Sequence, residues 1–295
     1  MYLPNRFRTF IPYKQFILKQ IRAFPSNLLK NYVKSYWYLE IEPADIPFQQ
    51  IYFPYGAHEL IFYVHNPTEM AWLKEDRFFL QPTSFFSGQF SQPFKMSFTK
   101  PSICIGASLY PWAGKNLFSH PADEFQNVMA PLSILDKNAA IAEELTKYRF
   151  SVADMFQLLD KYLISKLGKW ALDPLSKQLI QIFTEKPSLS DHKGLVSSLG
   201  LSRRRIEQRF KESVGLTMGF YSRKLKFQKS IALIKQGHLS IAQVGLEAGY
   251  YDQSHFISEF KEFSNTTPLE YRQNQSTILS FLSGSDLFNK KGLAT

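Results

Sequence analysis

The chain of 295 residues contains a single cysteine, Cys104. It therefore cannot form a disulfide within itself, and no metal site can be built on cysteines. Cys104 lies in an apolar run and is expected to be a small buried hydrophobe. No run approaches 18 apolar residues, and the N-terminal stretch MYLPNRFRTFIPYKQF lacks the apolar core of a signal peptide. We expect a cytoplasmic protein without a membrane partner.

Motifs of the common enzyme classes are also missing. There is no glycine-rich phosphate loop, and no order of Ser, His and Asp fits a nucleophile elbow. The acidic pairs Asp123–Glu124 and Glu143–Glu144 are sequence neighbours that face different directions, so they do not form a dyad. Strand alternation places His58, beside Glu59, and His65 on opposite faces, against a metal site. We expect no enzyme, cofactor or metal site; an enzyme in the N-terminal half stays open only if a bound metal is found.

Charge is unevenly distributed along the chain. The protein carries 35 Lys and Arg against 25 Asp and Glu. Residues 1–130 carry 12 against 9, residues 131–174 carry 6 of each, and residues 175–295 carry 17 against 10. Basic surfaces are common in globular proteins, so the excess gains meaning only where it coincides with a motif that binds a polyanion.

The N-terminal part, residues 1–130, is predicted to be β-rich. Short aromatic and β-branched runs at 51–56, 59–65, 77–82, 94–98 and 103–111 are separated by Pro, Gly, Asn and Ser. They indicate a sandwich or small barrel with an aromatic interior. Core packing is the more frequent role of such side chains, but five of them are also candidates for lining an effector pocket: Tyr52, His58, Phe62, Phe86 and Trp112.

Residues 131–172 are predicted to be a helical connector, with dimerisation as a candidate role. Apolar residues recur at helical spacing and break near residues 149–151, which predicts two helices. Ser151 is expected to cap the second, with Asp154 at the position of a capping box. Asp173–Pro174 is expected to open a further helix over 174–185, since Asp caps helices and Pro favours their first turn.

A helix-turn-helix unit is predicted within residues 195–215, LVSSLGLSRRRIEQRFKESVG. Its first helix is apolar on one face and Gly200 makes the turn. Ser202 caps the second helix and is also a candidate contact with DNA. In that second helix Ile206, Phe210 and Val214 follow a ladder that must face inward. The outward residues lie where a recognition helix meets base edges, and Arg, Gln and Glu side chains can pair with them: Arg203, Arg204, Arg205, Glu207, Gln208 and Lys211.

A second unit follows within residues 240–272. Ser240 and Gln243 form a capping box, and Gly249 turns the chain. Asp252 caps the recognition helix and is also a candidate contact with DNA. Tyr250 is expected to fill the core between the helices. Phe256, Phe260 and Phe263 are expected to face inward, and five side chains are left outward: Gln253, Ser254, His255, Ser258 and Lys261. For His255, supporting the start of the helix is the more frequent role than touching a phosphate.

A helix over 217–236 is predicted between the two units. Twenty residues span about 30 Å, which is close to the ~34 Å rise of one turn of DNA. The two recognition helices can then enter successive major grooves from one face, so that one chain binds an asymmetric site. Two such units within the basic part of the chain indicate double-stranded DNA as the partner.

Residues 190–272 resemble the AraC/XylS-type transcriptional regulator domain. The matching segments are LGLSRRRIEQRFKESVG, YSRKLKFQKSIALI and SIAQVGLEAGYYDQSHFISEFKEFSNTTPLEYR. The chain departs from the usual pattern at Met218, Ser258 and Asn265. Because Ser258 is not basic, Lys261 is the basic residue of the second recognition helix. The first recognition helix, with Arg203–Arg205, is therefore expected to dominate base reading. FPYGAHELIFYV, FFSGQFSQPF and IGASLYPWAGKNLFSHPADEF are similar to the uncharacterised β-rich half that precedes this domain in some family members.

The expected fold is therefore α+β and multidomain. A β-rich N-terminal sandwich or barrel and a helical connector precede an all-α domain, residues 173–275, with two helix-turn-helix units; residues 276–295 form a tail with a short helix. The expected function is a sequence-specific transcription regulator modulated through its N-terminal domain. The alternative is a ligand-binding or interaction protein with a degenerate, non-specific DNA-binding domain. RNA polymerase, a small-molecule effector and a second copy of the chain are further candidate partners.

Overall fold

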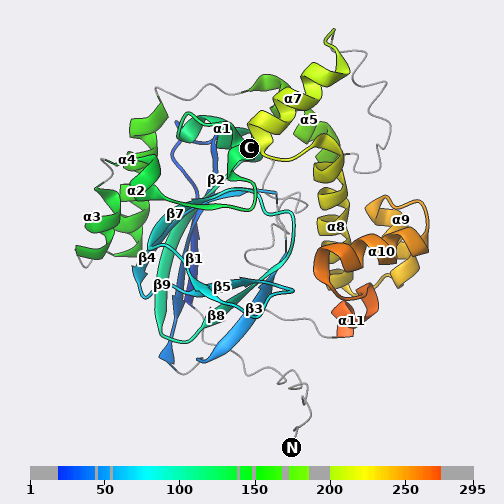
Figure 1. Cartoon of the computed structure of the whole chain (residues 1–295), viewed down its shortest axis with the longest axis horizontal. Helices are drawn as coiled ribbons and strands as arrows, with labels where there is room; N and C mark the ends of the chain where they lie inside the picture. Colours follow the sequence, from blue (N-terminus) through cyan, green and yellow to red (C-terminus); the bar gives the residue numbers. More distant parts are fainter. Residues whose placement is uncertain are drawn as a thin grey trace, which may run out of the picture.

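The structure is a computed structural model that describes residues 19–43, 46–53, 56–137, 140–147, 151–167, 173–185 and 200–273. Two β-sheets form one side of the molecule, and the helices that follow residue 200 lie beside them (Figure 1). The predicted combination of a β-rich N-terminal region with an all-α C-terminal region is confirmed.

The larger sheet has six strands joined by antiparallel pairs. In sheet order they are β1 (Lys19–Ala23), β2 (Val33–Ile41), β9 (Ser102–Leu109), β4 (His58–His65), β7 (Ser84–Ser87) and β10 (Met129–Pro131). The smaller sheet has the order β3 (Phe48–Tyr52), β8 (Phe94–Phe98), β5 (Glu69–Trp72) and β6 (Phe79–Leu80). The sequence predicts a strand over 77–82, but only Phe79 and Leu80 pair, at the edge and exposed.

The central strands of the six-stranded sheet are buried on both faces, and successive side chains along each strand point to opposite faces. On β2, Tyr36 and Tyr38 belong to the core on the helical side, whereas Trp37 and Leu39 belong to the core that faces the smaller sheet. The strands β4, β7 and β9 divide their side chains in the same way. This double burial explains why these runs are almost continuously apolar instead of alternating with polar residues.

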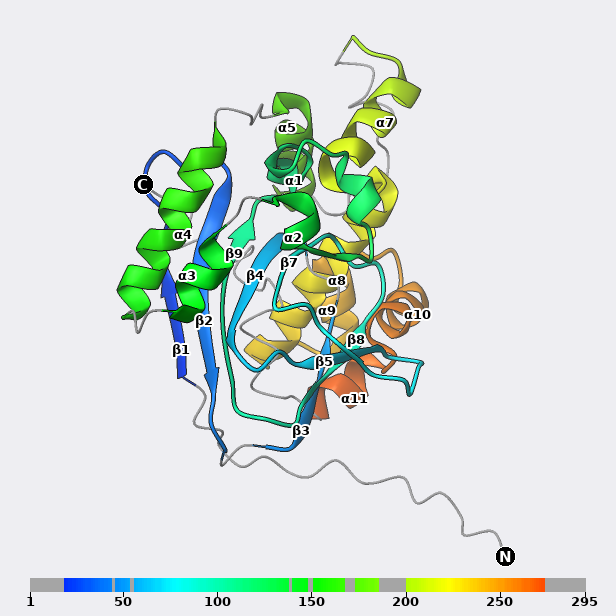
Figure 2. The ribbon, with the colours of Figure 1, turned by 60° about the vertical axis from the view of Figure 1, so that its left-hand side comes forward.

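Helices cover the outer face of the larger sheet. Among them are α2 (Leu132–Leu135), α3 (Ile141–Lys147) and α4 (Val152–Lys166), and Figure 2 shows α3 and α4 beside β1 and β2. Ser151 caps α4 through a capping box with Asp154, as predicted. Asp160 on α4 accepts hydrogen bonds from the Ser26 amide and the Tyr36 hydroxyl, which ties this helix to the sheet.

The C-terminal helices begin and end at the residues that the sequence marks. They are α5 (Pro174–Glu185), α7 (Arg203–Val214), α8 (Met218–Gln236), α9 (Ile241–Ala248), α10 (Gln253–Ser264) and α11 (Pro268–Gln273). Ser202, Thr217, Ser240 and Asp252 cap the helices that follow them. The first helix of the first unit, expected within 195–199, lies outside the described residues, as does the tail 276–295.

Asn265 ends α10 in the left-handed conformation, with φ of 59°. Asparagine is among the residues that adopt this conformation most readily after glycine, because its short polar side chain bonds locally. Its amide donates to the Lys261 carbonyl at 2.8 Å and closes the helix. Asn265 therefore ends α10 in the backbone conformation that glycine most often provides at the end of a helix.

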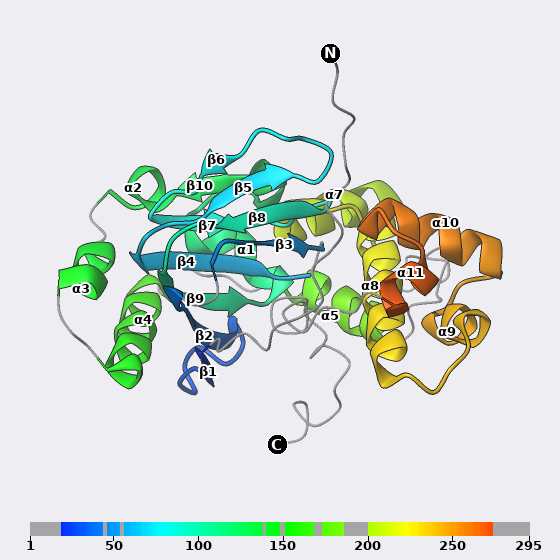
Figure 3. The ribbon, with the colours of Figure 1, turned by 90° about the horizontal axis from the view of Figure 1, so that it is seen from below.

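The two helix-turn-helix units belong to different cores. In the first, Ile206, Phe210 and Val214 join the core that continues under the larger sheet. In the second, Phe227 of α8 packs with Phe256, Phe260 and Phe263 of α10 in a separate cluster. The helix α8 runs along the boundary between the sheets and the helices α9 and α10 (Figure 3).

Candidate nucleic-acid interface

The helix α7 has one buried face and one polar face. Ile206, Phe210 and Val214 are fully buried, as the ladder predicts. The Ser202 hydroxyl accepts from the Arg205 amide and fixes the start of the helix. Six of the seven candidate residues are exposed and Glu207 is half-buried: Ser202, Arg203, Arg204, Arg205, Glu207, Gln208 and Lys211. The basic N-terminal half of α7 is thus open to a partner, and Arg203 also pairs with Glu207 at 2.8 Å.

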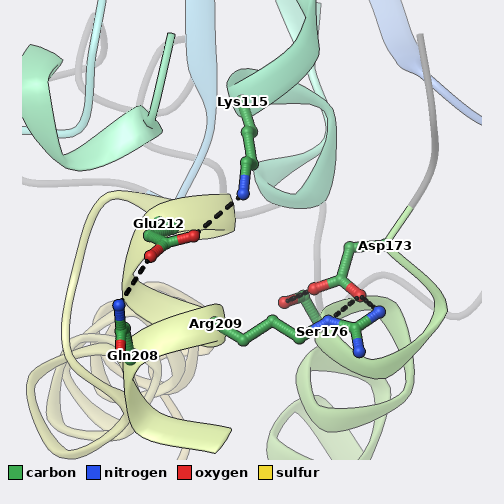
Figure 4. A network of polar contacts seen from close by, with 6 residues as sticks. All are labelled: Lys115, Asp173, Ser176, Gln208, Arg209 and Glu212. Carbon is green, nitrogen blue, oxygen red and sulfur yellow. Dashed lines mark hydrogen bonds and ion pairs between the residues drawn. The ribbon is translucent and has the colours of Figure 1, made fainter. Parts of the chain in front are cut away.

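The C-terminal half of α7 lies against the N-terminal part of the chain. Its contacts are the short helices η2 (Pro111–Ala113), α1 (Gly114–Leu117) and η3 (Ala122–Phe125). Lys115 Nζ donates to Glu212 Oε2 at 2.9 Å, and Gln208 Nε2 donates to Glu212 Oε1 at 3.0 Å (Figure 4). These two hydrogen bonds, led by that from Lys115, lower the pKa of Glu212. Glu212 is therefore an anion that links the two parts of the protein.

Two further basic residues of α7 are neutralised by carboxylates. Lys211 Nζ lies 3.3 Å from Asp123 Oδ2 on η3. Arg209 Nε donates to Asp173 Oδ1 at 2.9 Å, and the Ser176 hydroxyl donates to the other oxygen of Asp173 at 2.5 Å (Figure 4). Lys211 is among the residues predicted to contact DNA, whereas Arg209 is not. Nothing local in the sequence indicates these pairs, because their members lie far apart in the chain.

The junction is also closely packed. At Gly215, which ends α7 with φ of 88°, an added Cβ would lie 2.8 Å from the Ala122 carbonyl oxygen. Lys224 of α8 is fully buried, and its Nζ donates to Gln89 Oε1 at 2.8 Å and to the Phe90 carbonyl at 3.3 Å. Burial lowers the pKa of Lys224 well below its ordinary value. The helix α8 is thus anchored to the segment between β7 and β8 through a buried polar contact.

The second recognition helix, α10, also has an exposed polar face. The Asp252 carboxylate accepts from the His255 amide at 2.8 Å and caps the helix. Asp252 and the five side chains expected outward are all exposed: Gln253, Ser254, His255, Ser258 and Lys261. His255 Nε2 also lies 3.3 Å from Glu259, which agrees with a role in supporting the first turn.

Arg223 of α8 supports the second recognition helix, although no motif in the sequence marks it. Its guanidinium bonds Glu259, with Nε 2.6 Å from Oε1, and also pairs with Glu262. Both carboxylates belong to α10. Arg223 therefore offsets the acidic charge beside the second recognition helix and holds it against α8.

The helix α8 sets the spacing of the two recognition helices. Its 19 residues correspond to about 28 Å at 1.5 Å per residue. One turn of DNA rises ~34 Å. The two exposed polar faces are therefore joined by a continuous helix whose length is close to one DNA turn.

The five candidate effector residues do not surround one cavity. Phe62, Phe86 and Trp112 lie in the core on the helical side of the larger sheet, and His58 stacks on Phe86 at 5.4 Å. Tyr52 lies on the smaller sheet and lines a cavity between the two sheets. In the described part of the chain, no group of three or more His, Cys, Asp or Glu side chains is placed to hold a metal ion. Nor does that part contain a helix with the length and apolar character to cross a membrane.

Comparison with known proteins agrees with this geometry. Residues 195–274 match the family described as "Helix-turn-helix domain", and residues 21–131 match "Domain of unknown function (DUF6597)". The C-terminal part of the chain is a helix-turn-helix domain. The matched residues include the segments that carry the resemblance to the AraC/XylS type in the sequence.

Among its relatives is the xylose operon regulatory protein of Escherichia coli (strain K12), 35% identical over 85 residues, which are 29% of this chain and 22% of that protein. The probable transcription factor PqrA of Proteus vulgaris is 30% identical over 80 residues, 27% of this chain and 66% of that protein. The chain spans about a quarter or less, 22% to 26%, of the first relatives that it matches. The structure of ToxT from Vibrio cholerae aligns with 88% of this chain and 98% of its own, at 13% identity and a TM-score of 0.46.

Proposed function

We propose that this protein is a sequence-specific DNA-binding transcription regulator in which α7 and α10 enter successive major grooves. The observation that carries the proposal is the pair of capped helices with exposed polar faces, joined by the single helix α8. The basic excess of residues 175–295 attracts the backbone phosphates that border the grooves. The matched relatives named above are a regulatory protein and a probable transcription factor. Contacts with RNA polymerase and a homodimer remain predictions from the resemblance.

Base reading is assigned mainly to α7. Arg203, Arg204 and Arg205 are exposed in its first turn, where a recognition helix meets base edges. An arginine can bond guanine through two hydrogen bonds, which discriminates against other bases by about 1–3 kcal/mol. The exposed face of α10 is less basic, with Lys261 as its basic residue. A degenerate domain that binds every sequence equally is the alternative.

Arg204→Ala is expected to weaken binding to a preferred DNA site by about 1–3 kcal/mol and to relax the preference at one or two base pairs. Lys147→Ala makes the same change of charge on the exposed surface of α3 and serves as the control. Fluorescence anisotropy on the preferred site and on unrelated DNA measures both effects. If Arg204→Ala weakens binding to the two DNAs equally, the arginine contacts the backbone and does not read bases.

The pair between Lys211 and Asp123 is expected to oppose DNA binding. Asp123→Asn removes the carboxylate that holds Lys211 and a negative charge near the recognition helix. An exposed pair contributes about 0–1 kcal/mol, so we expect DNA binding to tighten by up to about fivefold at low salt and less at high salt. Asp76→Asn, far from α7 in the sequence, is the control. Unchanged or weaker binding by Asp123→Asn would show that this contact does not compete with DNA.

A further inference from the structure

A cavity of about 60 Å³ lies between the two sheets. Aromatic and thioether side chains make most of its wall, among them Trp37, Tyr52, Phe53, Phe90, Phe94 and Met96. Every described residue that lines it is uncharged. A charged ligand would leave water here without an opposite charge to compensate, which is costly. The wall therefore selects for an uncharged occupant.

One polar atom in this wall has no partner within the protein. The Tyr52 hydroxyl is buried, with the residue 4% exposed, and makes no hydrogen bond to any described residue. By contrast, the nearby Tyr63 hydroxyl bonds both Thr68 and Gln81. A buried polar group without a partner is destabilising, because it has lost its hydrogen bonds to water and gained none in the protein. Tyr52 is therefore an unused hydrogen-bonding group in an apolar site.

The same wall is in contact with the second helix-turn-helix unit. The Phe53 ring packs edge-on against Phe227 of α8 at 5.7 Å and against Tyr271 of α11 at 5.8 Å. The Phe90 carbonyl accepts from Lys224 of α8. If Phe53 moves, the side chains of Phe227 on α8 and Tyr271 on α11, which pack against it, must therefore move as well.

We propose that this cavity binds a small, uncharged, mainly apolar molecule that hydrogen-bonds the Tyr52 hydroxyl, and that Phe53 transmits its binding to the second helix-turn-helix unit. The second clause rests on the proposed DNA-binding function; the first does not. The cavity is smaller than the ~150 Å³ that accommodates benzene in an engineered protein core. Met96 and Met129 line it, and their flexible side chains can move to enlarge it.

Phenol, toluene and benzoate test the site, because they share one ring and differ in the polar group. Binding to the full chain is measured by isothermal titration calorimetry at pH 7. We expect phenol to bind, toluene to bind several-fold more weakly, and benzoate not to bind. Tyr52→Phe keeps the ring and removes the unpartnered hydroxyl, so it should fold and bind phenol about tenfold more weakly while toluene binding is unchanged. Equal phenol binding by both proteins, binding of benzoate, or no binding of phenol or toluene overturns the proposal.

The coupling is tested with Phe53→Leu, which keeps an apolar wall but removes the ring between the cavity and α8. In the unmodified protein, saturating phenol is expected to change DNA affinity by threefold or more. In Phe53→Leu, phenol should still bind within about threefold of its original affinity, but DNA affinity should not respond. Phenol binding without any effect on DNA affinity in the unmodified protein would overturn the coupling alone. Phenol binding by a chain that binds no DNA would refute the proposed function and leave the site standing.

Discussion

Replacing Phe227 with alanine is expected to lower the free energy of unfolding by about 3–5 kcal/mol, the usual cost of removing a buried aromatic ring. Phe227 is fully buried and lies at the centre of the second unit. Its ring is 5.1 Å from those of Phe260 and Phe263 and 5.7 Å from that of Phe53. The substitution removes contacts within the second unit and between that unit and the sheets.

Urea unfolding followed by circular dichroism measures the effect. Leu246→Ala is the matched control, because Leu246 is an apolar helical residue that is 65% exposed, and it should change stability by no more than about 0.5 kcal/mol. Because the cluster around Phe227 is the core of the second unit, we also expect the variant to unfold this unit before the rest of the protein. A loss below about 1 kcal/mol would contradict the assigned core.

Lowering the pH from 6.5 toward 3 is expected to destabilise the protein through His58. Burial, followed by the nearby charge of Lys224, lowers the pKa of His58 from 6.5 to about 3, although the backbone of Pro111 and Val214 partly offsets this. Between these values the unfolded chain binds a proton at His58 and the folded chain does not. The stability that neutral, buried His58 contributes is therefore fully present above pH 6.5. Below that pH, the free energy of unfolding falls by up to about 1.4 kcal/mol for each pH unit.

His58→Gln isolates this contribution, since glutamine does not titrate in this range. We expect the variant to be less stable at pH 7 but to lose stability less steeply as the pH falls, in urea unfolding at pH 7, 6, 5 and 4. His65→Gln changes an exposed histidine of the same strand and should follow the original protein. Parallel pH profiles for the original protein and His58→Gln would show that His58 is not the group responsible.

The C-terminal helices can be predicted from sequence because their limits are local. Ser202, Ser240 and Asp252 each accept a hydrogen bond from the amide three residues further on, and Gly249 adopts positive φ, so a short segment defines each turn. The predicted helix 174–185 coincides with α5 for a related reason, since it begins at Asp173–Pro174.

The candidate effector set could not be assembled from sequence. Strand alternation separates its members, because Phe62 and Phe86 face the helices whereas Tyr52 faces the space between the sheets. Which of two buried faces encloses a cavity depends on how the sheets pack. The contacts of α7 with the N-terminal part could not be predicted from the sequence either, since Lys115 and Glu212 are 97 residues apart. The assignment of base-reading and effector residues remains a prediction, as do the domain limits.

Selection of DNA from a random pool by the full-length protein tests the central claim most directly. A regulator with two recognition helices is expected to enrich a motif of two parts whose centres lie about one helical turn, ~10 base pairs, apart. The part read by α7 should be the more strongly specified, because its first turn carries Arg203, Arg204 and Arg205. Recovery of unrelated sequences, bound equally and lost together as salt rises, would contradict sequence-specific recognition and leave only contact with phosphates.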